Sequence, residues 1–130
     1  MINSNAFNYI NVLKKAADAS WIRNEVITNN IANVNTPGYK RKDVQFESLL
    51  MAALTGDNSL DKRVARLRAD KINAQVYTDY SNLSYRKDGN NVDIDTEEAN
   101  LAENQIKYYA LLDSITQEFN RLKMVLQNNK

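Results

Sequence analysis

The chain has 130 residues, 17 Lys and Arg against 16 Asp and Glu, a formal net charge of +1 and 43% hydrophobic residues. This composition suits one globular domain and differs from that of polycations and intrinsically disordered chains. The absence of Cys and His excludes disulfides, zinc sites built from these residues, thiol nucleophiles and histidine-based catalysis. With 3 Gly and 1 Pro, the chain has few of the turn residues that many short strands need, so long helices are expected.

The longest uninterrupted apolar run, Leu49 to Leu54, is far shorter than the roughly 18 to 20 residues of a membrane helix. We therefore expect no membrane span and no cleaved signal peptide. If the chain leaves the cytoplasm, we expect it to do so without cleavage of a signal peptide.

A long helix is predicted from Asn3 to Asn35. Eight positions, six of them apolar, recur at alternating spacings of three and four residues and form a seam along one face. The seam residues are Ile10, Leu13, Ala17, Ser20, Asn24, Ile27, Ile31 and Val34. Pro37 pushes Thr36 out of the helical region, and Pro37 and Gly38 suit the two central positions of a type II turn. The helix should therefore end near Val34 or Asn35.

A second long helix is predicted from Asp95 to about Gln127. Asp95 is expected to cap it, and Glu98 can complete a capping box three residues later. Glu97, Glu98 and Glu103 place negative charge near the positive end of the helix dipole. The seam of this helix is expected at Leu101, Gln105, Tyr108, Leu112, Ile115, Phe119, Leu122 and Leu126.

The middle segment, Lys40 to Ile94, differs in character. Short helices are predicted over Val44 to Leu54 and, with basic residues, over Leu60 to Lys71. Ala74 to Arg86 is predicted to be extended, and Asp88-Gly89-Asn90 forms a turn signal. The fold class is mainly α, with long N- and C-terminal helices paired as a coiled coil beside a smaller irregular segment of short helices that has room for a short β-hairpin.

Both long helices also carry apolar residues outside their seams, whereas a two-helix hairpin has only one internal interface. These residues are Phe7, Trp21, Ile22, Val26, Ala102, Ile106, Tyr109, Met124 and Val125. Either the middle segment covers them or they form a surface for self-association. The asparagines at the end of the first helix have two corresponding interpretations: a solvated helix end, or amides that satisfy backbone groups where helix ends meet neighbours.

The acidic residues after position 87 do not form a calcium loop. Counting from Asp88, position six is Asp93 where glycine is needed, and position twelve is Ala99 where a bidentate Glu belongs. A turn followed by a helix cap explains these acids. Carboxylate catalysis by Glu97, Glu98 or Glu103 would require a pocket that raises one pKa, and the sequence indicates no such pocket.

The basic stretch favours a solvated helix face or an assembly contact over a nucleic-acid site. It comprises Lys62, Arg63, Arg66, Arg68 and Lys71. Acidic residues flank it, and no aromatic residues are interleaved with it. The sequence therefore predicts no catalytic residue, metal or cofactor, and no nucleic-acid or small-molecule partner. A soluble helical adaptor or chaperone remains the alternative to an assembly subunit.

Two runs of residues resemble one known family. Asn29-Asn30-Ile31-Ala32-Asn33-Val34-Asn35-Thr36-Pro37-Gly38-Tyr39-Lys40 is similar to the signature of the bacterial flagellar rod and hook proteins. Asp88-Gly89-Asn90-Asn91-Val92-Asp93-Ile94-Asp95, followed by Leu101-Ala102-Glu103-Asn104 and Lys107-Tyr108, looks most like the proximal rod members. Asn35 departs from the family pattern, which frequently has Asp there.

The resemblance implies a structural subunit of the proximal rod that self-assembles through its terminal helices into a helical, hollow drive shaft. Residues 1–36 and 95–130 would form one inner-core domain, and residues 37–94 a turn and variable segment. The implied partners are copies of itself, the other rod proteins, the rod adaptor protein and the flagellar export gate. The implied location is the periplasmic rod of the basal body, reached through type III export.

The resemblance and the seams together assign roles to particular residues. Seam packing is assigned to Ile27, Ile31, Val34, Leu112, Ile115, Phe119 and Leu122, with Asn29, Asn30 and Asn33 beside them in the assembly contacts. Thr36, Pro37, Gly38 and Tyr39 are expected to turn the chain out of the inner layer.

Overall fold

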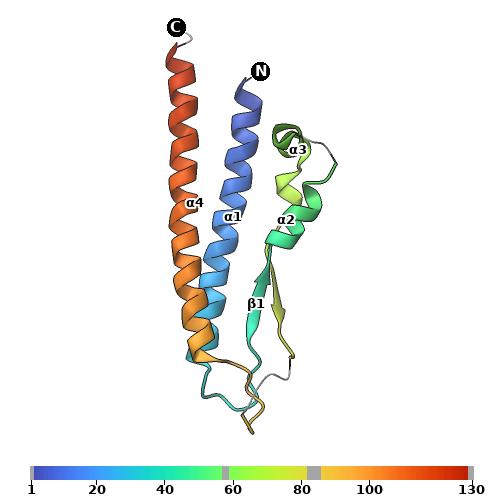
Figure 1. The fold of residues 1–130 in the computed structure, drawn as a ribbon, viewed down its shortest axis with the longest axis vertical. Helices are drawn as coiled ribbons and strands as arrows, with labels where there is room; N and C mark the ends of the chain where they lie inside the picture. The colour runs from blue at the N-terminus through green and yellow to red at the C-terminus, as the bar shows by residue number, and fades with distance from the viewer. Residues whose placement is uncertain (1, 57–58, 82–85, 129–130) are drawn as a thin grey trace.

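Two long antiparallel helices lie side by side and define the long axis of the molecule (Figure 1). The computed structural model describes residues 2–56, 59–81 and 86–128, with side chains from residue 6 onwards. Helix α1 spans Ile2–Ala32 and α4 spans Ile94–Asn128, and both chain ends lie at the same end of the hairpin. The prediction of a mainly α fold with paired terminal helices is confirmed.

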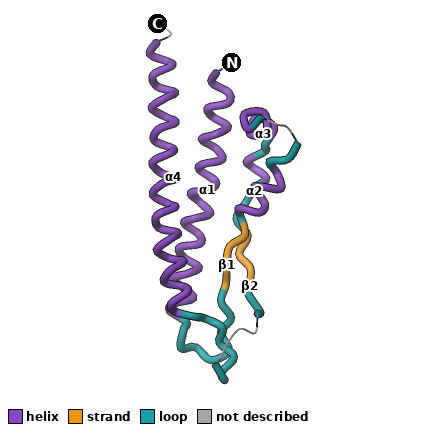
Figure 2. Tube along the Cα trace, viewed as in Figure 1, coloured by secondary structure: helices purple, strands orange, loops and turns teal. Residues whose placement is uncertain are grey.

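The middle segment lies along α1, on the side away from α4 (Figures 1 and 2). In chain order it contains strand β1 (Lys42–Gln45), helix α2 (Glu47–Ala53), helix α3 (Leu60–Arg66), the 3₁₀ turn η1 (Ala69–Lys71) and strand β2 (Gln75–Thr78). The strands form a two-stranded antiparallel sheet whose register runs from Lys42 opposite Thr78 to Gln45 opposite Gln75.

Helix α1 is buried on two faces. Its seam residues Ile10, Ala17 and Ile27 are buried, and Ala19 on another face forms a core cluster with Phe46 and Ile72 of the middle segment. The middle segment therefore covers part of the apolar surface of α1 outside the seam. The apolar residues on the outer side of α4 stay exposed. No helix in the described part of the chain is long and apolar enough to cross a membrane.

The predicted seam of α4 is correct at every second position and one residue too late at the others. Leu101, Tyr108, Ile115 and Leu122 are buried or half-buried, whereas Gln105, Leu112, Phe119 and Leu126 are exposed. Their places are taken by Asn104, Leu111, Glu118 and Val125. Adjacent Leu111 and Leu112 fit either register equally well. The side-chain amide of Asn104 decides it, since its Nδ2 donates to the backbone oxygen of Ser20 at 2.7 Å.

Several predicted boundaries in the first two thirds of the chain were wrong. Helix α1 ends at Ala32, two residues before Val34. The helix predicted from Val44 begins only at Glu47, because the preceding residues form β1.

In the second half of the middle segment, the helix and the strand are also shorter than predicted. The basic helix predicted over residues 60–71 stops at Arg66, after which Leu67 adopts an extended conformation and η1 follows. Of the extended stretch predicted over residues 74–86, only β2 is a strand in the described part, and residues 82–85 lie outside it.

The cap of α4 is Asp93 and not the predicted Asp95. The Asp93 carboxylate accepts the N–H groups of Asp95 at 3.1 Å and Thr96 at 3.4 Å, and Thr96 Oγ1 donates back to it at 3.1 Å. These contacts satisfy donors in the first helical turn. The predicted capping-box partner, Glu98, is exposed.

Ile27 tests how much the α1–α4 seam contributes to stability. Replacing Ile27, which is 2% exposed, by Ala should lower the free energy of unfolding by about 2 to 4 kcal/mol, because a buried side chain is lost and a cavity remains. The matched control is Ile106→Ala, where the side chain is 73% exposed and the change should be below about 0.5 kcal/mol. Urea unfolding measures the free energy of unfolding of both variants. Equal losses would contradict a stabilising role of the seam at Ile27.

Candidate functional site

The turn that ends α1 has the geometry expected for Pro37-Gly38. Gly38 has a φ of +72°, and the N–H of Tyr39 donates to the carbonyl of Thr36 at 3.2 Å. A type II turn requires this positive φ, which glycine adopts without steric cost. The Gly38 N–H donates to the Asp88 carbonyl at 2.8 Å, so the two turn motifs of the sequence lie against each other.

Asn90 caps the end of α1 from a turn more than fifty residues further along the chain. Its Nδ2 donates to the carbonyls of Asn33, Val34 and Thr36 at 2.9, 3.1 and 2.8 Å. Its Oδ1 accepts the N–H of Val92 at 2.8 Å, and the side chain is fully buried. The carbonyls at a helix C-terminus lack helical partners, and Asn90 supplies one for this turn. The sequence by itself indicates only a turn at this position.

Asn30 joins α1 to β1 through a fully paired buried amide. Its Nδ2 donates to the Lys42 carbonyl at 2.8 Å, and its Oδ1 accepts the Lys42 N–H at 2.9 Å. The amide thus bonds to the outer edge of β1 as a neighbouring strand would. Oδ1 also accepts Tyr39 Oη at 3.1 Å, and Nδ2 donates to Glu97 Oε2 at 3.1 Å. These contacts hold residues 42–45 extended, so the helix predicted from Val44 begins only at Glu47.

Glu97 and Arg41 form the ion pair at the centre of this region. Glu97 is 1% exposed, and its Oε1 accepts Arg41 Nε at 2.6 Å. Arg41 also reaches Asp79 at 3.1 Å and Asp43 at 3.3 Å. Burial alone would lower the pKa of Arg41, but the hydrogen bond and charge of Glu97, together with Asp79 and Asp43, outweigh it, so the pKa is raised and the guanidinium stays charged. Glu97 is thus a buried anchor, whereas the sequence had indicated only a charge near the helix dipole.

We call the residues Asn30, Arg41, Asn90, Asn91 and Glu97 the polar junction. Asn91 completes it, because its Oδ1 accepts the Arg41 N–H at 2.7 Å and its Nδ2 donates to the Asp79 carbonyl at 2.7 Å. The junction connects the end of α1, the turn after it, both strands and the start of α4. It brings together the two runs of the sequence that carry the family resemblance.

The predicted assembly residues fall into three groups in the structure. Ile27, Asn30 and Leu122 are buried, and Ile31, Asn33, Val34 and Ile115 are half-buried. Asn29, Leu112 and Phe119 are exposed, with Leu112 at 39% and Phe119 at 50%. The assignment of Leu112 and Phe119 to the intramolecular seam was therefore wrong. In the turn, Thr36, Pro37 and Gly38 are exposed and Tyr39 is half-buried.

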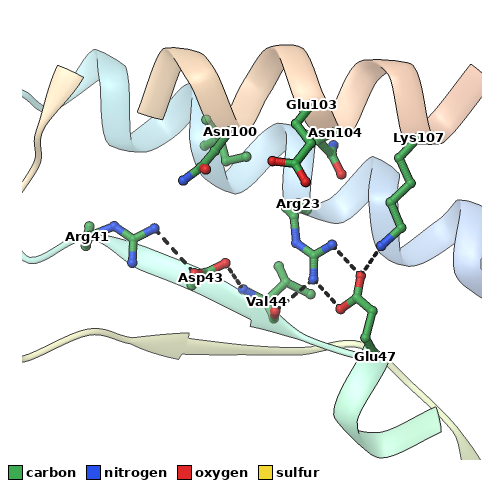
Figure 3. A pocket seen from close by; sticks show the side chains of 10 residues that line it. Arg23, Arg41, Asp43, Val44, Glu47, Asn100, Glu103, Asn104 and Lys107 are labelled. Atoms are coloured by element: carbon green, nitrogen blue, oxygen red, sulfur yellow. Dashed lines mark hydrogen bonds and ion pairs between the residues drawn. The ribbon is translucent and has the colours of Figure 1, made fainter. Parts of the chain in front are cut away.

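A polar cavity of about 330 Å³ lies between α1, α4 and β1 (Figure 3). Arg23 from α1 and Lys107 from α4 both converge on Glu47, the first residue of α2 (Figure 3). Arg23 makes two hydrogen bonds of 2.7 Å to the carboxylate and a third, of 3.0 Å, to the Val44 carbonyl. The Arg23 hydrogen bond lowers the pKa of Glu47 to about 2, more than burial raises it. At the edge of the cavity, a salt-bridge clamp therefore ties the middle segment to both helices.

The comparisons with known proteins agree with this architecture. A family model described as "Flagella basal body rod protein" matches residues 10–40, which include most of α1 and the turn after it. "Flagellar basal body rod protein FlgB" of Bacillus subtilis (strain 168) is 39% identical, with 91% of this chain and 92% of the relative covered. The protein of the same name from Borrelia hermsii is 31% identical over 91% of this chain and 95% of the relative, and that from Escherichia coli (strain K12) is 33% identical over 82% and 83%.

These matches assign the paired-helix hairpin to the structural subunits of the flagellar basal body rod. Such subunits assemble with other rod components in the basal body. At 39% identity over nearly the whole of both sequences, the chain belongs to the FlgB family of flagellar basal body rod proteins.

Glu97 tests the polar junction. Glu97→Gln keeps the shape but removes the buried carboxylate from the Arg41 guanidinium and leaves it only the more exposed carboxylates of Asp43 and Asp79, so we expect a loss of about 3 kcal/mol in the free energy of unfolding. The control is the neighbouring Glu98→Gln, which is exposed and should change it by less than about 0.5 kcal/mol. Urea unfolding at pH 7 measures the free energy of unfolding of both variants. If Glu97→Gln leaves it unchanged, the polar junction does not stabilise the fold.

Glu47 predicts a dependence of stability on pH. Because its folded pKa of about 2 lies below the ordinary value of 4.5, its stabilising effect is present above about pH 4.5 and is lost as the pH falls toward 2. Glu47→Gln should therefore destabilise the protein at pH 7 and have much less effect near pH 2. The control is Glu103→Gln, which lines the same cavity. A pH-independent difference between wild type and Glu47→Gln would contradict the clamp.

Proposed function

We propose that this rod subunit assembles with copies of itself and with other rod proteins through the outer face of its helix pair, forming a helical hollow shaft. The observation that carries this proposal is the apolar surface left exposed on α4. It includes Ile106, Tyr109, Leu112, Phe119, Met124 and Leu126. Exposed apolar surface of this extent is typical of a protein contact site.

The geometry of assembly follows from where this surface lies. The middle segment covers α1 on the side away from α4, so it leaves the outer face of α4 open (Figure 1). If that face meets a different face of the next subunit and the rotation does not close, a helical filament results. A hollow shaft is a filament of this kind.

The proposal includes a division of the chain into two parts. Residues 1–36 and 95–130 would form the inner core of the shaft, and residues 37–94 a peripheral unit. The turn at Thr36, Pro37, Gly38 and Tyr39 would lead the chain out of the inner layer, and the polar junction would hold that exit in one orientation.

Family membership extends the proposal to the route of assembly. The subunit would be exported by the flagellar type III system without cleavage and would reach the periplasmic part of the rod. The export gate and the rod adaptor protein would be its neighbours there. No observation favours the alternative of a soluble adaptor or chaperone, nor does any point to an enzyme.

Two exposed residues of α4 test the assembly surface. Leu112→Ser and Phe119→Ser should leave the thermal melting of the purified chain within a few degrees of wild type, because neither side chain is buried in the hairpin. Each variant is expressed in cells that lack the wild-type protein. The number of isolated basal bodies with a complete rod should fall at least tenfold, and so should the fraction of swimming cells.

The control for this experiment is Asp113→Ser, a change at an exposed polar neighbour on the same turn. It should support normal swimming. Normal rods built from the Leu112→Ser, Phe119→Ser double variant would refute the proposed assembly surface.

A further inference from the structure

Side chains close the outer edge of strand β1. Asn30 bonds to both the N–H and the carbonyl of Lys42, at 2.9 and 2.8 Å. Arg23 donates to the Val44 carbonyl at 3.0 Å, and the Val44 N–H donates to Asp43 Oδ1 at 2.7 Å. The backbone groups of Lys42 and Val44 therefore point away from β2 and already have partners, so no further strand can pair at this edge.

The outer edge of β2 is open. In an antiparallel sheet, opposite residues alternate between pairs whose backbone groups bond to each other and pairs whose groups point away from each other. Lys42 lies opposite Thr78, and Val44 lies opposite Val76. Since the groups of Lys42 and Val44 point away from β2, those of Thr78 and Val76 point away from β1. None of these outward groups has a hydrogen-bond partner in the described part of the chain.

The composition and position of β2 make this edge available to another strand. β2 lies beyond β1 as seen from α1 (Figure 2), and β1 is the only described element that it packs against extensively. Its sequence, Gln75–Thr78, is uncharged, and Val76 and Tyr77 are 49% and 48% exposed. Proteins usually protect an exposed edge with lysine, proline or a bulge, and β2 has none of these. Unpaired backbone groups at two-residue spacing select another extended backbone as the occupant.

We propose that β2 pairs antiparallel with β2 of a second copy, so that two chains outside the shaft form one continuous four-stranded sheet. The second copy is favoured because its β2 presents the same open edge, in a self-complementary register. When Tyr77 lies opposite Tyr77 of the other copy, Val76 of each copy lies opposite Thr78 of the other. This register pairs every outward backbone group of both strands, and a shift by two residues would leave some unpaired.

The side chains also fit this register. The two Tyr77 residues form a pair without direct hydrogen bonds, in which opposite side chains lie closest, and aromatic pairs at such positions stabilise sheets. Asp79 is the nearest charged residue along the chain. It would lie opposite Gln75 of the other copy and not opposite Asp79, so like charges do not meet across the new strand pair.

This pairing is separate from the contacts proposed for the shaft. Both copies use the same edge, so the contact is two-fold and closed, and it adds no third copy. A shaft in which each subunit meets a different face of the next contains no two-fold pairs. The pairing itself does not rest on the proposed function. Within that function, a chain has to leave the pair before it enters the shaft, so pairing opposes self-assembly of free chains.

Tyr77→Cys tests the register in the purified full-length chain, which has no other cysteine. Opposite residues of this kind have Cα atoms about 4.5 Å apart, which a disulfide can bridge. The control is Gln75→Cys on the same face of β2, because the two introduced cysteines would lie several residues apart in this register. Under mild oxidation, the linked dimer should form roughly tenfold faster or more in Tyr77→Cys. Equal rates in the two variants overturn the proposed pairing.

Amide hydrogen exchange tests the backbone contacts in the wild-type chain. The N–H groups of Val76 and Thr78 should exchange freely in dilute solution and become protected as the protein concentration rises. The Tyr77 N–H points to β1 and should be protected at every concentration. Val76→Lys places a charge on the edge and should remove the concentration dependence at Thr78.

Sedimentation velocity over the same concentrations measures the dimer itself. We expect a dimer that appears together with protection of Val76 and Thr78 and that Val76→Lys abolishes. A dimer that forms without protection of these amides is held by another surface and overturns the proposal. A chain that stays monomeric at the highest concentration, with both amides unprotected, overturns it as well.

Discussion

The structure depends on the buried ion pair between Arg41 and Glu97 and on the amide of Asn30 that joins it. At this end of the molecule the chain leaves α1, reverses direction, and later returns to begin α4. Reversal exposes backbone carbonyls that have no helical partner, and burial makes each unpaired group costly. Side chains from three separate segments supply the missing partners, so the helices, strands and turns can only form this junction together.

The apolar seam and the polar junction have different roles. The seam is largely apolar, and apolar contacts alone tolerate a shift in register. Polar contacts do not, because a shift would leave buried amides and charges unpaired. The hydrogen bonds from Asn104 to the Ser20 backbone and from Asn30 to Glu97 therefore fix how α4 lies against α1. Polar residues in a helix seam can specify register in this way, at some expense of stability.

Within one chain, the apolar surface of the helix pair is covered on one side and exposed on the other. The middle segment and the clamp of Arg23, Lys107 and Glu47 cover α1 and the groove beside it. On α4, leucine, phenylalanine and tyrosine side chains remain in contact with water. In the proposed rod, this asymmetry keeps apolar surface available for neighbouring subunits.

The sequence by itself determined the two long helices, the turn between Thr36 and Tyr39, and the family. These features depend on local spacing: heptads of apolar residues, and a proline followed by a glycine. Only the tertiary structure decided the register of α4, the strand at residues 42–45 and the role of Asn90. Each of these depends on a hydrogen-bond partner far away in the chain, such as Asn30 for β1 and the α1 carbonyls for Asn90. Periodicity reports which face of a helix is apolar, but it carries no information about which distant polar group will meet it.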